Sequence, residues 1–142
     1  MPLPQPARGL VISYAYLWHT EHRLGQESGR KDRPCVIILA VEGAGGERRV
    51  TVAPITHVEP LSPEAGIEIP LPTKRRLGLD EARSWIVVSE VNRFAWPGPD
   101  LRPTGNERFA YGYLPPALFQ QVQQHLARYL TAKGLSVVVR TE

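Results

Sequence analysis

The stretch that decides the fold is residues 34–55, PCVIILAVEGAGGERRVTVAPI. Pro34 to Val41 is a continuous apolar run, which is typical of a strand covered on both faces. Residues 42–47 form a glycine-rich turn, and from Arg48 to Ile55 apolar side chains alternate with polar ones, as they do along a strand. The stretch therefore predicts a β-hairpin.

Short β-branched and aromatic runs on both sides of this hairpin predict further strands. These runs are Gly9–Trp18, Ile67–Ile69, Ser84–Val91, Phe109–Leu114 and Leu135–Val139, the last as an edge strand. The chain has 12 glycines and 14 prolines among its 142 residues, more than a helical bundle tolerates. Residues 94–103 hold three of the prolines and predict an irregular segment.

One long helix is predicted near the C-terminus. Pro115 and Pro116 suit a first helical turn, where a missing N–H leaves no bond unmade. Apolar residues then recur three and four apart from Leu118 to Leu130, and a lysine and a glycine at 133–134 suit the helix end. The predicted fold class is mainly β (α+β): a small, strongly bent antiparallel sheet or barrel with this helix packed on it.

The length and composition of the chain exclude several classes of protein. The length suits one domain, predicted as residues 9–142 after a flexible proline-rich tail at residues 1–8. The single cysteine excludes a disulfide framework and a cysteine-based zinc cluster. The longest apolar run is far shorter than the roughly 20 residues of a membrane span, and the N-terminus lacks the apolar region of a signal peptide. We expect a soluble, cytoplasmic protein. Its net charge of +3 permits a nucleic-acid partner without demonstrating one.

Familiar catalytic signatures are missing from the sequence, which has no GxGxxG, P-loop or GxSxG motif. His19 and His22 lie on a predicted polar loop, residues 19–33, without a third ligand, so no metal site is predicted. Cys35 lies inside an apolar run and is expected to be a packed core thiol. His125 is expected at the boundary of the helix face.

The mouth of the hairpin offers a candidate phosphate site. The start of one antiparallel strand lies beside the end of its partner, so Arg33 is expected next to Thr56. Arg30, Lys31 and His57 are expected nearby. A guanidinium holds phosphate through two oxygens, and a hydroxyl can donate to an oxygen that gains charge.

A purely structural interpretation of the same residues stays open. Arg33 would then pair with Asp32 or Glu27, and Thr56 would close a turn. Most aromatic residues are expected in the core of so small a sheet, with Trp18 and Trp96 as the candidates for stacking on bases because both border polar segments.

A basic segment, residues 73–76, is predicted to be a loop with two possible roles. Lys74, Arg75 and Arg76 would contact an RNA backbone in one interpretation. In the other, which we favour slightly, the loop is solvated and its charge is offset by Asp80 and Glu81.

In this order, the motifs resemble those of the MazF/PemK family, the toxins of bacterial toxin–antitoxin pairs. That family has a short strand, a G-x-E-x-x-G loop, an Arg-Pro pair, an apolar strand, and a hairpin strand ending in P-I-T or P-C-T. Here the loop and Arg-Pro pair span Gly25 to Pro34, and the second strand ends at Pro54-Ile55-Thr56. Residues 78–80 and 84–91 resemble the family's "GL…S-x-V-L-V-D-Q-I" segment. The resemblance runs from about Gly9 to Leu130.

The resemblance implies an SH3-like, MazF-type barrel with a C-terminal helix, and a homodimer. It also implies a metal-independent endoribonuclease without a cofactor, which cleaves single-stranded RNA, inhibits growth and is neutralised by an acidic segment of a cognate antitoxin. In that chemistry the ribose 2′-hydroxyl attacks the adjacent phosphorus and leaves a cyclic phosphate. Arg33 would stabilise charge and act as a proton donor, since a guanidinium stays protonated. Thr56 would hold the non-bridging oxygens. The expected RNA-binding residues are Glu27, Arg30, Lys31, His57, Lys74, Arg75 and Arg76.

The sequence departs from the family pattern at several points. Leu10 stands where members commonly have an acidic residue, and the loop before Arg33 is one or two residues longer than in many members. His57 would either aid proton transfer or be merely exposed, and Asp80 lies near a region where one branch of the family has an acidic base. A non-catalytic RNA- or protein-binding barrel is the alternative function. A gyrase poison is disfavoured because residues 138–142 are not aromatic.

Overall fold

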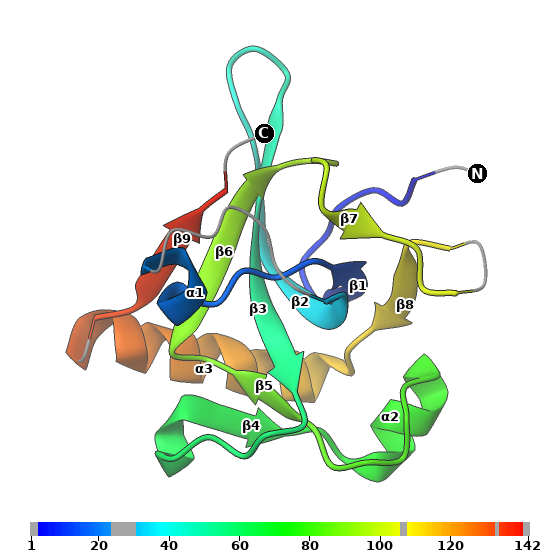
Figure 1. The fold of residues 1–142 in the computed structure, drawn as a ribbon, viewed down its shortest axis with the longest axis vertical. Helices are drawn as coiled ribbons and strands as arrows, with labels where there is room; N and C mark the ends of the chain where they lie inside the picture. Colours follow the sequence, from blue (N-terminus) through cyan, green and yellow to red (C-terminus); the bar gives the residue numbers. More distant parts are fainter. Residues whose placement is uncertain (1–2, 24–30, 106–107, 133, 141–142) are drawn as a thin grey trace.

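A computed structural model describes residues 3–23, 31–105, 108–132 and 134–140 (Figure 1). Within them lie nine strands, three α-helices and a short 3₁₀ helix. In chain order the elements are β1 Leu10–Tyr14, α1 His19–Arg23, β2 Arg33–Glu42, β3 Arg48–Thr56, the 3₁₀ helix Pro63–Ala65, β4 Gly66–Glu68, α2 Leu71–Leu77, β5 Trp85–Val87, β6 Glu90–Ala95, β7 Leu101–Arg102, β8 Ala110–Tyr113, α3 Pro116–Ala132 and β9 Ser136–Val139.

The strands form a single sheet in the order β4-β5-β3-β2-β1-β7, with β6 added to β3, β9 to β6 and β8 to β1. Every pairing is antiparallel except that of β6 with β9. Among the described residues the end strands β4 and β7 do not pair with each other, so the sheet is not closed there. The prediction of a mainly β fold with a long helix near the C-terminus is confirmed.

The predicted hairpin is β2 and β3. Its register runs from Cys35 opposite Pro54 to Glu42 opposite Arg48, with an irregularity between Ile37 and Leu39. Gly46 in the turn has a φ of 83°, a left-handed conformation that suits glycine. In Figure 1 this turn extends beyond the rest of the sheet.

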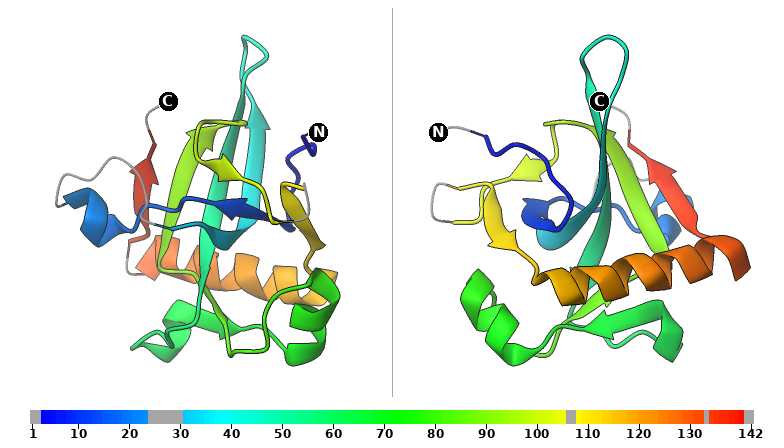
Figure 2. Two further views of the ribbon diagram at one scale, coloured as in Figure 1. Left: turned by 45° about the vertical axis from the view of Figure 1, so that its right-hand side comes forward. Right: turned by 180° about the vertical axis from the view of Figure 1, so that it is seen from behind.

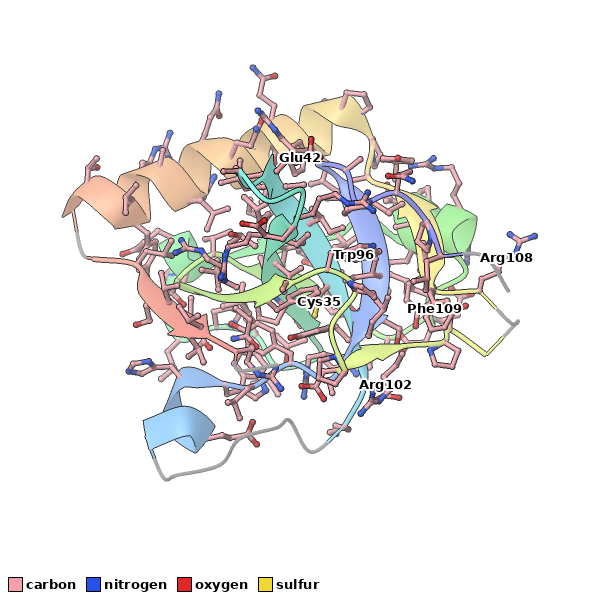
Figure 3. The ribbon with its side chains drawn as sticks, turned by 90° about the horizontal axis from the view of Figure 1, so that it is seen from above. Cys35, Glu42, Trp96, Arg102, Arg108 and Phe109 are labelled. Atoms are coloured by element: carbon pink, nitrogen blue, oxygen red, sulfur yellow. The ribbon has the colours of Figure 1, made fainter. Side chains whose placement is uncertain are left out.

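Both faces of the central strands are buried, which explains the continuous apolar run in β2. Val11 and Val36 point to one side and pack with the inner face of α3, including Val122. Their sequence neighbours Ile12 and Cys35 point to the other side and pack with Tyr14, Phe94 and the rest of a second cluster. Figure 2 shows α3 crossing one side of the sheet, and Figure 3 places Cys35 in the interior. Cys35 is thus a core thiol, as predicted, and burial raises its pKa.

Two segments predicted to be loops contain helices. Residues 19–23, the first part of the predicted loop 19–33, are α1. Residues 73–76 lie in α2, which has a proline in its first turn and ends at Gly78 with a φ of 75°. Its inward positions are Lys74 and Leu77, three apart. Because one of these two is a lysine, the segment lacks the apolar spacing that predicts a helix.

The predicted strand 84–91 is in fact two strands. β5 pairs with β4 and with the end of β3, whereas β6 pairs with the earlier part of β3 and with β9. Trp85 to Val88 is a continuous apolar run, and the polar pair Ser89 and Glu90 that follows it stands at the break between the two strands. The segment predicted to be irregular, 94–103, also contains the end of β6 and the short strand β7.

None of the helices in the described part of the chain is long and apolar enough to cross a membrane.

Candidate functional site

Arg33 and Thr56 lie where the two hairpin strands end. Arg33 begins β2, where it pairs with Tyr14, and Thr56 ends β3, where it pairs with Trp85. The β2–β3 register, carried two residues beyond Cys35 and Pro54, sets Arg33 opposite Thr56. Both residues line the same groove, so the structure brings the two strand ends together as the hairpin geometry implies.

The guanidinium of Arg33 is held by packing and not by a carboxylate of the described residues. Its central carbon lies 4.9 Å from the centroid of the Trp18 ring, a cation–π arrangement. Its Nε is buried and has no hydrogen-bond partner in the described part of the chain. Asp32 pairs with Arg102 instead, at 3.5 Å, and Glu27, the other carboxylate expected to pair with Arg33, lies outside the described residues. A buried donor without an acceptor costs free energy.

The hydroxyl of Thr56 has a structural partner and a remaining donor. The residue is only 9% exposed, and its Oγ1 accepts a hydrogen bond from the backbone N–H of Val58 at 3.2 Å. Thr56 therefore does close a turn. Because a hydroxyl has one donor and two acceptor positions, this bond leaves the O–H to donate elsewhere. Within the groove that it lines, Thr56 can act as a hydrogen-bond donor to a ligand.

A cavity of about 350 Å³, here called the central cavity, opens on one side of Arg33. It is formed by the start of β2, the end of β3, the C-terminal end of α2 and the residues that precede β5 and β8. Its lining comprises Lys31, Asp32, Arg33, Pro34, Ile55, His57, Lys74, Gly78, Leu79, Asp80, Ser84, Thr104 and Tyr111.

Three side chains of the central cavity form a hydrogen-bonded row. His57 Nε2 lies 2.7 Å from Asp80 Oδ2, and Lys74 Nζ lies 2.7 Å from Asp80 Oδ1. Lys74 is only 1% exposed, and its Nζ also donates to Ser84 Oγ at 2.6 Å and to the carbonyl of Ala82. The buried ammonium thus has three oxygen acceptors and is not a solvent-exposed rim residue.

The hydrogen bonds of this row determine the charge of Asp80 and the orientation of His57. The hydrogen bond from Lys74 is the main cause that lowers the pKa of Asp80, and the hydrogen bond from His57 acts in the same direction. The ionised carboxylate then accepts a hydrogen bond from Nε2 of His57, which leaves Nδ1 as the acceptor of the neutral ring. An imidazole fixed in this way is suited to taking a proton from a bound hydroxyl.

A second space, the apolar groove of about 570 Å³, also borders Arg33. It is lined by Trp18, Arg33, Thr56, Val58, Glu59, Pro60, Leu61, Ser62, Ala65, Val87, Ser89 and Glu90. Glu90 Oε1 accepts hydrogen bonds from Tyr16 Oη and the His19 backbone N–H, both at 3.0 Å. Burial raises the pKa of Glu90. Sequence reasoning missed this residue, although a lone carboxylate in an apolar strand is a recognisable signal.

The other predicted site residues are dispersed. Lys31 lines the central cavity, whereas Arg75 and Arg76 are exposed and line a neighbouring pocket. Arg75 faces Glu81 at 3.3 Å, and Lys74 faces Asp80, so the predicted offset of this basic segment is confirmed. Arg30 lies outside the described residues. Of the two tryptophans proposed for base stacking, Trp18 lines the groove, while Trp96 packs against Phe94 and the second core cluster.

No protein-family model matches the chain, and a search of curated proteins finds no match either. The resemblance to the MazF/PemK family therefore rests on the order of the motifs themselves.

Proposed function

We propose that this chain is a metal-independent endoribonuclease that cuts single-stranded RNA at a phosphate bound beside Arg33. The observation that carries the proposal is the position of that guanidinium. It lies at the boundary of two spaces, with a buried Nε that has no acceptor among the described residues and with the Thr56 hydroxyl lining the same groove. A phosphodiester in these spaces would accept hydrogen bonds from the part of the guanidinium that lines them and from the Thr56 hydroxyl.

The proposed reaction is an internal transesterification. The 2′-oxygen of the ribose bonds to the adjacent phosphorus, the bond from phosphorus to the 5′-oxygen breaks, and the products are a 2′,3′-cyclic phosphate and a 5′-hydroxyl. Negative charge grows on the non-bridging oxygens during this step. Arg33 and Thr56 would donate hydrogen bonds to them, and donors fixed in place before the reaction are the effective ones.

The proton balance needs one acceptor and one donor. In this proposal His57, held by Asp80, takes the proton of the 2′-hydroxyl through Nδ1. The departing 5′-oxygen gains its proton from the Arg33 guanidinium, which is charged before the step; the guanidinium is then reprotonated from solvent, to which His57 returns the proton that it took.

The charges around the site suggest where the parts of the RNA would lie. The apolar groove carries two carboxylates, Glu59 and Glu90, so it disfavours phosphate and suits a nucleobase beside Trp18 and Leu61. In the central cavity the basic groups Lys31, Arg33, Lys74 and His57 outnumber the carboxylates Asp32 and Asp80, so this space suits the ribose and its phosphate.

The proposal extends to the wider properties that the family resemblance implies. The curved sheet would be an SH3-like barrel of the MazF type, and the protein a cytoplasmic homodimer that inhibits growth until a cognate antitoxin binds it. The motif order from Gly9 to Leu130 supports this extension. Induced expression in bacteria should slow growth for the parent and not for Arg33→Ala, and sedimentation of the purified chain should give the mass of a dimer.

The direct test compares two versions of one single-stranded oligonucleotide pool in excess EDTA. One version is all RNA, and the other carries 2′-deoxyribose throughout. We expect the RNA to be cut with cyclic phosphate ends and the deoxy version to stay intact, because only RNA has the attacking hydroxyl. If the folded protein binds RNA and leaves it intact, the alternative of a non-catalytic binding barrel replaces the proposal.

A further inference from the structure

A third space, here called the basic pocket, lies next to the central cavity and has a volume of about 250 Å³. It is lined by Arg75, Arg76, Leu77, Gly78, Thr104, Arg108, Ala110 and Tyr111. Three of these eight are arginines, and none of the described lining residues is acidic. Such a pocket attracts an anion and repels a cation.

We infer that the basic pocket is a second phosphate subsite, which binds the backbone phosphate next to the one held at Arg33. The inference rests on the proposed function, because it assigns a further part of the same RNA. With this subsite, the protein would bind a longer stretch of RNA than the catalytic residues alone contact.

The three spaces follow one another across the molecule. Arg33 belongs to both the apolar groove and the central cavity. Gly78, Thr104 and Tyr111 belong to both the central cavity and the basic pocket. An RNA strand that enters at the apolar groove and passes Arg33 therefore reaches the arginines of the basic pocket next. Along this path the lining residues change from acidic and apolar to basic.

Gly78 lies at the junction of the two spaces. A Cβ at this position would meet no other atom within 4 Å, although the residue lines both the central cavity and the basic pocket. The side chain that is missing here would thus project into free space and not into the protein.

The arginines come from two elements and have donors to spare. Arg76, on α2, donates one bond at 3.0 Å to the backbone carbonyl of Tyr113, which directs the guanidinium toward β8. A guanidinium has five N–H donors, so most of them remain for a ligand. Arg108 precedes β8 and projects from the protein in Figure 3. Among the described residues neither Arg76 nor Arg108 has an ion-pair partner, whereas Arg75 faces Glu81.

The test measures binding of a 2′-O-methyl RNA, which cannot be cut, by fluorescence anisotropy at several salt concentrations. The variant Arg76→Ala/Arg108→Ala removes two charges from the pocket. The control Arg93→Ala/Arg128→Ala removes two exposed charges from β6 and α3, and neither of these arginines lines any of the three spaces.

The result expected is a weaker salt dependence for the pocket variant only. On a single strand, each phosphate that the protein no longer neutralises lowers the slope of log affinity against log salt by about 0.7. We expect a change of about that size, with the control equal to the parent. Equal slopes for the two variants would overturn the inference even if the parent cuts RNA, and a parent that does not bind RNA would overturn it together with the proposed function.

Two further binding measurements distinguish a phosphate subsite from the alternatives. A neutral methylphosphonate at the linkage next to the one cut should weaken binding to the parent and have little effect on the pocket variant. If polyglutamate, and not RNA, shows the dependence on Arg76 and Arg108, the pocket recognises an acidic protein segment, and the RNA inference is wrong.

Discussion

Trp18 packs over the guanidinium of Arg33, and Thr56, at the end of β3, lines the same apolar groove as these two residues. Both side chains are thus fixed by the fold before any ligand arrives. That arrangement favours a reaction in which charge develops on an oxygen, because donors that need no reorganisation stabilise such charge best. The proposed reaction depends at the residue scale on two groups, one permanently charged and one neutral donor.

Two substitutions distinguish the effect of the Thr56 hydroxyl on the cleavage rate from that of the shape of the side chain. Thr56→Val keeps the shape and loses the O–H, so we expect the rate of RNA cleavage to fall about 100-fold. Thr56→Ser keeps the hydroxyl and should stay within a few-fold of the parent. Single-turnover rates measure this, with thermal unfolding as the control for the lost bond from Val58. A Thr56→Val protein that is as fast as the parent would remove Thr56 from the mechanism.

The lowered pKa of Asp80 predicts a pH-dependent contribution to stability. Its folded pKa lies below the unfolded value of about 3.9, so the stabilisation is present above that value and is lost as the pH falls through the folded pKa. The free energy of unfolding of the parent should exceed that of Asp80→Asn at about pH 7, and the difference should shrink toward about pH 3. Urea unfolding at a series of pH values measures it. A difference that grows in acid would contradict the assigned cause.

At the scale of elements, the patterns that predict structure are those that rest on apolar spacing. The hairpin β2–β3 and the helix α3 were predictable because their buried positions carry apolar side chains. The helix α2 was not, because one of its inward positions is Lys74, whose charge is neutralised by Asp80 beyond the end of the helix. A sequence pattern cannot show that a lysine has a buried partner.

The same distinction applies to the candidate site. The proximity of Arg33 and Thr56 follows from hairpin geometry and could be predicted. The row from Lys74 through Asp80 to His57 joins α2, the segment after it and the end of β3. Its formation depends on how these elements pack, and no local spacing in the sequence encodes it.

Gly78 provides a test of how α2 ends. Its φ of 75° and ψ of 21° are left-handed, and a Cβ there meets no atom within 4 Å. Gly78→Ala should therefore lower the free energy of unfolding by about 1 kcal/mol through backbone strain alone. Gly78→Asn adds a larger side chain but tolerates this conformation, so it should be the more stable of the two in denaturant unfolding. The reverse order would show that crowding, and not conformation, limits this position.

At the scale of the whole molecule, a buried arginine near the C-terminus joins distant parts of the chain. Arg140 donates to the carbonyl of Ala15 at 2.9 Å and to Asn92 Oδ1 at 3.1 Å, and it pairs with Asp100. Asn92 in turn accepts a bond from the backbone N–H of Leu17. These contacts tie the residues after β1, the strand β6 and the chain before β7 to the end of β9.

Removing Arg140 should destabilise the fold more than any surface change. Arg140→Met leaves the buried Asp100 with only Arg102, at 3.5 Å, as a cation, and we expect a loss of about 3–5 kcal/mol in the free energy of unfolding. Arg140→Met combined with Asp100→Leu removes both charges and should be more stable than Arg140→Met alone. Denaturant unfolding of the three proteins measures this. If the double variant is no more stable than the single one, the pair is not the main interaction of Arg140.

The account of the whole molecule as an RNA-cleaving enzyme depends most directly on Arg33. The decisive measurement is the single-turnover rate of single-stranded RNA cleavage in excess EDTA for the parent, for Arg33→Ala and for the exposed control Arg93→Ala. We predict a loss of about 100-fold or more for Arg33→Ala, as is typical when a fixed charge-stabilising donor is removed, and an unchanged rate for the control. Equal rates for all three proteins, or no cleavage by the folded parent, would contradict the account.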